Sequence, residues 1–255
     1  GVFRMKIKWH GWADFEFTTR KGIKILVDAY YNGPNKPKDV EKVDYMVITH
    51  GSFDHALNWV NIAKKTTPKL IFCDHGTKIH GLRNGLPNNK FRIMVPGFSY
   101  EFDNILFKCV QSVHAAIFIS RDNDPQPGAI GEKVGEAITS FPFGVIIRDD
   151  DGSSVYVPGD TAIGSHLKTI RELYKPDVSL LHCVGVPGWS AEMTPKEAAL
   201  ALQWLGSQVV IPMHYDPSNV FMNQEVNKFI EYCYSLCPSA KVVKLKPGET
   251  FEYPA

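Results

Sequence analysis

No apolar run in the 255-residue sequence approaches the length of about 20 residues that a helix needs to cross a bilayer. A surplus of charge is also missing, because 28 lysines and arginines against 27 aspartates and glutamates leave a net charge of +1. This balance gives no electrostatic reason to expect nucleic acid or an anionic membrane as a partner. Residues 1–11 lack the apolar core of a secretory signal, so we expect a cytoplasmic protein.

Cysteine is scarce and irregularly spaced. The five cysteines lie at positions 73, 109, 183, 233 and 237, an odd number without the spacing of a disulfide framework. Cys233 and Cys237 fall on one face of an expected helix, where a paired-thiol metal site is the alternative interpretation. No other cysteine or histidine lies near them in sequence, which favours buried, reduced thiols.

Alternation of apolar runs with turn residues predicts an α/β protein with two sheets. Expected strands are Met5–Trp9, Phe15–Thr18, Ile23–Val27, Tyr45–Ile48, Leu70–Cys73, Ile105–Val113, Val145–Arg148, Ser154–Val157, Val178–His182 and Val209–Met213. Expected helices are His55–Lys65, Thr77–Arg83, Ser165–Tyr174, Pro195–Leu205 and Asn223–Leu236, with Thr194 capping the fourth. Expected hairpins join the second and third strands, Arg92–Val95 with Tyr100–Phe102, and Lys241–Lys246 with Thr250–Tyr253. No low-complexity linker divides the chain, which predicts one domain over residues 1–255.

A turn between an apolar strand and a helix gathers polar side chains. The strand Tyr45–Ile48 runs into Thr49, and the next six residues hold His50, Ser52, Asp54 and His55. A turn at the carboxyl end of a strand holds its side chains rigidly, and ligands of open α/β sheets bind in crevices at such ends. Two imidazoles and a carboxylate in this position favour a metal site over an incidental pair of histidines.

Four apolar strands end at residues of the same chemical kind. YMVIT runs into His50, ILFKCVQSV into His114, SVYVPG into Asp160 and VVIPM into His214. Taken alone, each would more often be a core histidine or an ordinary turn. Together with Asp54 and His55 they give four imidazoles and two carboxylates, a donor set suited to Zn²⁺, Mn²⁺ or Fe²⁺. Their common position predicts that they converge on one edge of the sheets.

The stretch Tyr45–Asn58 resembles the His-x-His-x-Asp-His signature of the metallo-β-lactamase superfamily, with Ser52 where the second histidine should stand. Gly159–Thr161 resembles the Gly-Asp-Thr motif of that superfamily, whose aspartate bridges two metals. Ile211–Tyr215 is similar to the last-histidine motif of a branch of metal-dependent hydrolases that includes ascorbate-6-phosphate lactonase, with N-acyl-phosphatidylethanolamine phospholipase D as a more distant relative. The resemblance covers Met5–Tyr253 and implies an α/β fold, the four-layer αβ/βα sandwich.

The resemblance also implies two metal sites. Site one would use His50, the residue at position 52 and His114, whereas site two would use Asp54, His55 and His214, with Asp160 shared between them. A serine hydroxyl is a poorer donor to a divalent transition metal than imidazole, so we expect site one to be weak and site two to be favoured. The expected cofactor is one or two divalent ions per chain, Zn or Mn, with Fe as a further option. Asp28 is expected to orient a ligand imidazole.

A second departure from the branch lies in Trp9–Trp12, where Trp12 stands in place of a histidine that lines the active site of relatives. We therefore expect altered substrate contacts at Trp12. His10 is close by, but a shift of one residue along a strand moves a side chain to the opposite face. The other histidines match no ligand position and are expected on the surface or in the core: His75, His80, His166 and His182.

The resemblance implies a metal-dependent hydrolase that acts on an ester, lactone or phosphodiester bond of a small-molecule substrate. A bound metal lowers the pKa of water from about 15.7 toward about 7 and so supplies hydroxide at neutral pH. Asp54 would orient this nucleophile and Asp160 would receive a proton. Because of Ser52, the alternative is a degenerate, non-catalytic protein of the same fold with a binding or structural role. We expect no nucleic-acid or membrane partner, and a homo-oligomer stays open.

A long stretch without an apolar pattern begins just after His114. The segment Ile117–Ala137 is rich in proline and glycine, and long structureless loops in compact domains are usually functional or disordered. Its position predicts a lid at the metal cleft. The alternative is a mobile loop without a functional role. Candidates for lid or substrate contacts are Trp12, Arg121 and Trp189.

Overall fold

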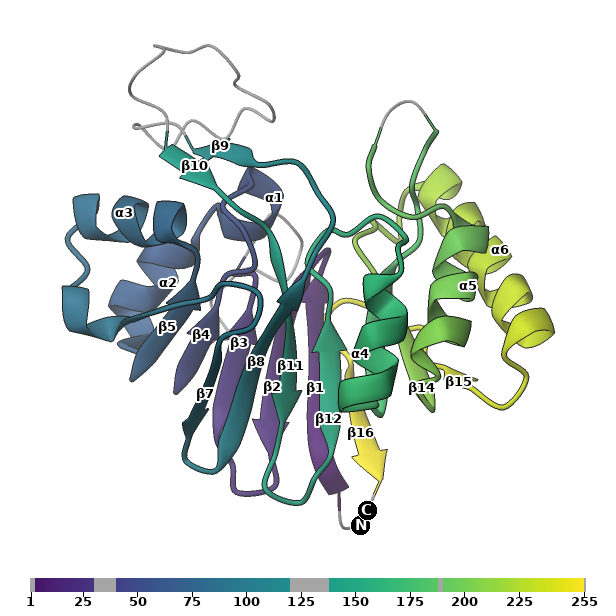
Figure 1. The fold of residues 1–255 in the computed structure, drawn as a ribbon, viewed down its shortest axis with the longest axis horizontal. Coiled ribbons are helices and arrows are strands. Elements are labelled where there is room, and N and C mark those ends of the chain that lie inside the picture. Colours follow the sequence, from purple (N-terminus) through teal and green to yellow (C-terminus); the bar gives the residue numbers. More distant parts are fainter. Residues whose placement is uncertain (1–2, 30–39, 120–137, 188–189, 255) are drawn as a thin grey trace. The chain divides into compact units, whose positions relative to one another are not determined.

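The computed structural model describes residues 3–29, 40–119, 138–187 and 190–254 (Figure 1). The chain divides into two compact units, each assembled from segments far apart in sequence. Unit 1 contains residues 1–95, 115–142 and 247–255, and unit 2 contains residues 96–114 and 143–246. The chain therefore passes from one unit to the other four times, and neither unit is a continuous stretch. The expectation of a single domain stays a prediction.

Unit 1 is built on a seven-stranded mixed sheet with the order β16-β1-β2-β3-β4-β5-β6. Its strands are β1 (Phe3–Gly11), β2 (Asp14–Thr19), β3 (Lys24–Val27), β4 (Tyr45–Val47), β5 (Leu70–Cys73), β6 (Phe91–Ile93) and β16 (Thr250–Pro254). The first three strands and β16 pair antiparallel, whereas β3 to β6 run parallel. The expected hairpin between the second and third strands is confirmed, because β2 and β3 pair antiparallel and the N–H of Gly22, at a φ of +79°, donates to the carbonyl of Thr19.

The helices of unit 1 are α1 (Phe53–Ala56), α2 (Trp59–Thr66) and α3 (His75–Arg83), with a 3-10 turn η2 (Asn88–Lys90). Figure 1 shows α2 and α3 beside β4 and β5. Apolar residues of α2, among them Trp59 and Ile62, belong to one buried cluster with Met46 and Ile71 of the sheet. Burial of each large apolar side chain of this kind contributes about 1.5–3 kcal/mol. A continuous helix over His55–Lys65 was expected, but Leu57 and Asn58 interrupt it and α1 ends at Ala56.

A small two-stranded sheet also belongs to unit 1. Its strands β9 (Ile117–Ile119) and β10 (Ile138–Ser140) pair antiparallel. They flank most of the stretch that we expected to form a lid. Residues 120–137 lie outside the described residues, so the lid stays a prediction.

Unit 2 is built on a second seven-stranded sheet with the order β15-β14-β13-β12-β11-β8-β7. Its strands are β7 (Ser99–Phe102), β8 (Ile105–Gln111), β11 (Phe143–Arg148), β12 (Ser154–Val157), β13 (Val178–His182), β14 (Val209–Met213) and β15 (Lys241–Val242). The strands from β12 to β15 are parallel, and the others pair antiparallel. The helices α4 (His166–Tyr174), α5 (Pro195–Leu205) and α6 (Val220–Leu236) pack beside one another on this unit (Figure 1).

Helix α5 begins and ends where the sequence predicts. The side chain of Thr194 accepts from the N–H of Glu197, and the Glu197 carboxylate accepts from the N–H of Thr194, which completes a capping box. Pro195 occupies the first turn, where its missing N–H costs nothing. Gly206 ends the helix in the left-handed conformation with a φ of +61°.

Two predicted hairpins are wrong. The strand at Phe91–Ile93 pairs in parallel with β5 of unit 1, whereas Ser99–Phe102 pairs with β8 of unit 2. Lys241–Val242 pairs in parallel with β14 of unit 2, whereas Thr250–Pro254 pairs with β1 of unit 1. In both cases a turn that looks like a hairpin loop carries the chain from one sheet to the other.

The cysteines are free thiols, as expected. Four of them are buried and Cys237 is half-buried. Burial raises the pKa of Cys109 and of Cys233 to about 12, so these thiols stay protonated at neutral pH. Within the described ranges, no helix combines the length and the apolar character that crossing a membrane requires.

Candidate metal centre

The predicted motif lies where the sequence places it, at the carboxyl end of a buried strand. Strand β4 is parallel to its neighbours β3 and β5, and the chain leaves it through a short loop that leads into α1. His50 lies in that loop and is fully buried, and His55 is fully buried within α1. Their ring centroids are 4.2 Å apart. The fold of unit 1 therefore brings the two imidazoles together.

Asp28 holds both ends of this loop. The N–H of Thr49 donates to Asp28 Oδ1 at 2.7 Å, and the Thr49 hydroxyl donates to Asp28 Oδ2 at 2.7 Å. His55 Nδ1 lies 2.8 Å from Asp28 Oδ2. Asp28 is fully buried and adopts a positive φ of +50°, a conformation that a non-glycine residue keeps only where its surroundings fix it.

The hydrogen-bond network assigns the protons of both imidazoles. Because a carboxylate only accepts, Nδ1 of His55 must carry its proton toward Asp28. The Thr49 hydroxyl proton is already directed at Asp28, so Thr49 Oγ1 accepts from His50 Nδ1 at 3.1 Å. Each neutral ring then keeps a lone pair on Nε2, the form in which histidine binds a metal. The contacts predicted for Asp28 are thus present.

A second buried carboxyl lies near Asp28. Burial raises the pKa of Asp14 well above its ordinary value, and the charges of Asp28 and Glu16 raise it further. Burial alone would also raise the pKa of Glu16, but hydrogen bonds from His10 and Lys24 and their charges outweigh it and lower the pKa. His10 is buried, and its Nε2 lies 3.6 Å from a carboxylate oxygen of Glu16. The His10 side chain is therefore directed to Glu16.

Asp54 is held between two side chains that the sequence marked as departures from the family pattern. The Ser52 hydroxyl donates to Asp54 Oδ1, and the Trp12 indole N–H donates to Asp54 Oδ2 at 3.2 Å. Trp12 has a φ of +53°, which a turn between β1 and β2 imposes. Ser52 therefore orients a predicted metal ligand, and it precedes α1 without capping it.

A contact that the sequence did not indicate fixes the loop backbone. The N–H of Gly51 donates to the Ser140 hydroxyl at 2.8 Å. Ser140 in turn donates to Asp74 Oδ1 at 2.9 Å, and Asp74 caps α3 by accepting from the N–H groups of Gly76 and Thr77. Ser140 and Gly51 are far apart in sequence, and no local pattern connects them.

Unit 2 carries the other predicted ligands at the ends of three strands. His114 follows β8, Asp160 follows β12 and His214 follows β14. The Ser112 hydroxyl donates to the carbonyl of Asp160 at 2.8 Å, and the N–H of Val113 donates to Thr161 Oγ1 at 2.9 Å. These bonds tie the end of β8 to the loop that follows β12. As a result His114 is held beside Asp160.

His214 and Asp160 face each other within unit 2. His214 Nε2 is 3.4 Å from Asp160 Oδ2, and both side chains are buried. The φ of His214 is +62°, so the residue that ends β14 is held in a strained conformation. Strain of this kind is common where a side chain must be aimed at a functional site.

Two histidines expected to have no part in the site support the Asp160 loop. His182 is fully buried with Nε2 at 3.0 Å from the N–H of Thr161 and Nδ1 at 3.2 Å from the N–H of Met193. A neutral imidazole accepts at only one nitrogen, so only one of these contacts is a full hydrogen bond at a time. His166 Nε2 lies 3.1 Å from Thr161 Oγ1. Both are buried, as is His80, whereas His75 is exposed, so each has one of the two positions expected, the core or the surface.

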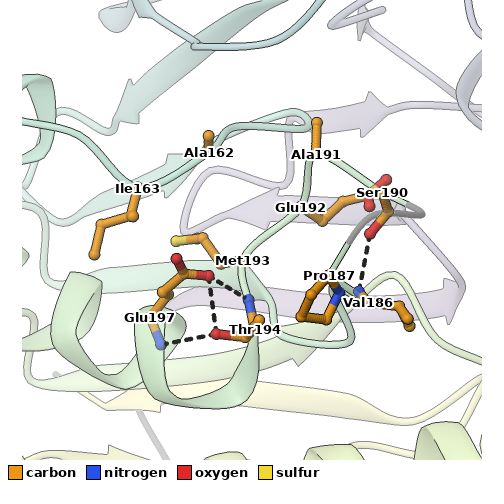
Figure 2. A pocket seen from close by; sticks show the side chains of 10 residues that line it. All are labelled: Ala162, Ile163, Val186, Pro187, Ser190, Ala191, Glu192, Met193, Thr194 and Glu197. Carbon is orange, nitrogen blue, oxygen red and sulfur yellow. Dashed lines mark hydrogen bonds between the residues drawn. The ribbon is translucent and has the colours of Figure 1, made fainter.

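Glu192 is a further candidate ligand that the sequence analysis missed. One ligand atom each of His114, Asp160 and Glu192 lie within 4.8 Å of one another. The segment around Glu192 also lines a cavity of about 230 Å³ in unit 2, whose described lining consists of residues 162–163, 186–187, 190–194 and 197 (Figure 2). Glu192 follows a stretch without strand or helix pattern, so no periodicity pointed to it.

The six predicted ligands divide evenly between the two units. His50, Asp54 and His55 belong to unit 1, whereas His114, Asp160 and His214 belong to unit 2. Of the candidates for substrate contacts, Arg121 and Trp189 fall outside the described residues, and Trp12 contacts Asp54. Imidazoles and carboxylates together form a donor set that fits Zn²⁺, Mn²⁺ or Fe²⁺.

Comparisons with known proteins find related metal-dependent hydrolases. Residues 6–214 match the model of the β-lactamase superfamily domain. The chain is 33% identical to the UPF0173 metal-dependent hydrolase of Koribacter versatilis, over 97% of each chain. It is also similar to the crystal structure of Igni18, a metallo hydrolase from Ignicoccus hospitalis, with a TM-score of 0.75, 26% identity and coverage of 98% of this chain and 99% of that one.

A more distant likeness concerns the fold alone. The metallo-β-lactamase fold protein YhfI from Bacillus subtilis has a TM-score of 0.68 at 14% identity, over 97% of this chain and 98% of that one. The predicted α/β fold class, the αβ/βα sandwich, is confirmed by this likeness and by the family match. The nearer likeness to a lactonase branch stays a prediction.

Proposed function

This chain belongs to the metallo-β-lactamase superfamily as a metal-dependent hydrolase, and we propose that it cleaves an ester, lactone or phosphodiester bond of a small molecule. The observation that carries the proposal is the network around Asp28. A single carboxylate fixes the protons of His50 and His55 so that both rings offer Nε2. Histidines that bind a metal typically donate their other ring N–H to a carboxylate or another acceptor, as His55 does to Asp28.

The proposed ligands come from both units. Asp54, His55 and His214 would form site two and His50 and His114 would belong to site one, with Asp160 shared. Zn²⁺ or Mn²⁺, with Fe²⁺ as a further option, suits these donors. When bound, the metal lowers the pKa of a coordinated water and polarises the bond to be cleaved.

The chain's own carboxylates would position the reactants. Asp54, fixed by Ser52 and Trp12, orients the attacking water through the oxygen lone pairs that these two bonds leave. Asp160 accepts the proton released as the water attacks. His214 faces Asp160, with Nε2 at 3.4 Å from Asp160 Oδ2, and would hold the same ion.

The cavity of unit 2 is the proposed substrate pocket. Its lining is mostly apolar, with Ile163, Val186, Pro187 and Met193 among the residues drawn in Figure 2. Among the described residues, its polar members are Ser190, Glu192, Thr194 and Glu197, without a lysine or arginine. A pocket of this composition favours a substrate with a small apolar group over a highly charged one.

The second candidate is a non-catalytic protein of the same fold, which the loss of an imidazole at position 52 favours. Purified chain should be depleted with a chelator, reloaded with Zn²⁺ or Mn²⁺, and assayed on generic aryl esters, lactones and bis-aryl phosphodiesters. We expect metal-dependent turnover of at least one class, which chelation abolishes and metal restores. A chain that binds metal but turns over no substrate class would support the non-catalytic candidate.

A further inference from the structure

Glu192 is placed to share a metal with His114 and Asp160. The three ligand atoms lie within 4.8 Å of one another. Donor atoms around one ion, each at about 2.1 Å from it, lie roughly 3 to 4 Å apart. Small side-chain rotations are therefore enough to bring all three donors onto one cation.

The backbone of Glu192 is fixed by close packing. A Cβ added at Gly185 would lie 2.1 Å from the carbonyl oxygen of Glu192, so only glycine allows this approach. The N–H of Gly185 donates to the carbonyl of Met193 at 2.9 Å, and the N–H of Met193 faces His182. Because His182 also faces the N–H of Thr161, one buried ring joins the Glu192 segment to the Asp160 loop.

The charges around Glu192 call for a cation. Asp160 is buried and Glu192 is half-buried, and two carboxylates this close repel each other when both are ionised. Across the described part of the chain, no lysine or arginine forms an ion pair with Glu192. A divalent ion would offset this repulsion.

We propose that Glu192 is a metal ligand in unit 2, where it shares one ion with His114 and Asp160. This inference rests on the proposed metal centre and changes its ligand count. The expectation of a weak site one assumed His50 and His114 as its only donors besides the shared Asp160. With Glu192, the unit 2 part of site one offers one imidazole and two carboxylates, and Ser52 serves to orient Asp54.

The change of donor also alters the expected metal. A carboxylate is a harder ligand than an imidazole. A carboxylate in place of an imidazole therefore shifts the metal preference of site one toward Mn²⁺ and Fe²⁺. Superfamily members with an imidazole at the position of Ser52 offer the metal one more nitrogen ligand than this chain does. The preference of this chain should therefore move back toward Zn²⁺ when the imidazole is restored and Glu192 is removed.

The test counts metal ions in the full chain. The experiment compares wild type with Glu192→Gln, Ser52→His/Glu192→Gln and the control Glu231→Gln, which lies at an exposed position on α6. Each protein would be stripped of metal, reloaded with Mn²⁺ and desalted, and its metal content would be measured by elemental analysis. Circular dichroism would verify that each variant is folded. We expect about two ions per chain in wild type and control, about one in Glu192→Gln, and about two again in the double variant. Loading from equimolar Mn²⁺ and Zn²⁺ should show a lower Mn²⁺ share in the double variant than in wild type.

The outcomes separate the two proposals. Equal metal content in wild type and Glu192→Gln would overturn the assignment of Glu192, and a raised KM in that variant would then mark it as a substrate contact. A wild-type chain with only one ion would also overturn it, because site one would be incomplete despite Glu192. A folded wild type that binds no Mn²⁺ or Zn²⁺ would instead overturn the proposed function itself.

Discussion

Asp28 is the residue on which the arrangement of the unit 1 histidines depends. Its two carboxylate oxygens accept from the backbone and hydroxyl of Thr49 and from His55 Nδ1. In Asp28→Asn the amide nitrogen cannot accept, so one ring loses its orientation or its tautomer. We expect the metal affinity to fall about 10–100-fold, as it does when supporting partners of ligand histidines are removed. Competition with a chromophoric chelator measures this change.

Asp177→Asn is the matched control for this substitution. Asp177 likewise accepts from a backbone N–H and a hydroxyl, those of Ser154, but it lies away from the proposed ligands. Its variant should lose stability without losing metal affinity. Wild-type affinity in Asp28→Asn would show that the network does not orient the ligands.

His166 should make stability depend on pH. Burial lowers its pKa below the ordinary value, so the folded state binds a proton less readily than the unfolded state. Stability is then full above the unfolded pKa of about 6.5 and falls as the pH drops toward the folded value, by at most about 1.4 kcal/mol per pH unit. In His166→Gln, which keeps a polar atom near Thr161, this part of the pH dependence should vanish. Urea unfolding of the metal-free chain between pH 5 and 8 measures it, and an unchanged slope would contradict the assignment.

At the scale of single residues, the sequence indicates the predicted ligands better than it indicates the residues that hold them in place. His50, His55, His114, Asp160 and His214 all end strands or enter helices, so their positions follow from the strand pattern. Ser140 and His182 support the predicted ligands through contacts between segments distant in sequence, and the proposed ligand Glu192 likewise lies near residues distant in sequence. Such contacts leave no periodic signal, and only the folded chain reveals them.

Helix α5 is the element that follows the Glu192 segment, and its cap is a local feature with a measurable effect. Thr194→Ala removes the side-chain acceptor for the N–H of Glu197 and the hydroxyl that donates to the Glu197 carboxylate at 2.8 Å. We expect the free energy of unfolding to fall by about 1 kcal/mol. Thr169→Ala, at an exposed position within α4, should change it by less than about 0.5 kcal/mol. Equal effects of the two substitutions in chemical denaturation would show that the cap contributes nothing.

Elements with strong local signals were predictable and connections were not. Pro195–Leu205 and Val209–Met213 match the expected bounds because a cap, a proline, a glycine and an apolar run define them. The two wrong hairpins contain ordinary turn residues, and a turn does not show which sheet its second strand will join. Leu57 and Asn58 interrupt an amphipathic pattern that is otherwise helical, because the chain turns between α1 and α2.

For the whole molecule, bound metal should add stability because it binds the folded chain more tightly than the unfolded one. At a free metal concentration of about 100 times the Kd, the gain is about 2.7 kcal/mol. The melting temperature of the reloaded chain should therefore exceed that of the stripped chain. In His214→Ala the difference should shrink, whereas in His75→Ala, at an exposed position, it should persist. An equal difference in His214→Ala and wild type would place the metal elsewhere.

The most direct test of the central claim is the metal content of the reloaded chain compared with His55→Ala and His214→Ala, one proposed ligand from each unit. Because both side chains are proposed to hold the same ion, removing either should release it. We predict a clear loss of metal in each variant relative to wild type, and a double variant that loses little more than either single one. Unchanged metal content in both single variants, with the chains folded, would contradict the proposed centre.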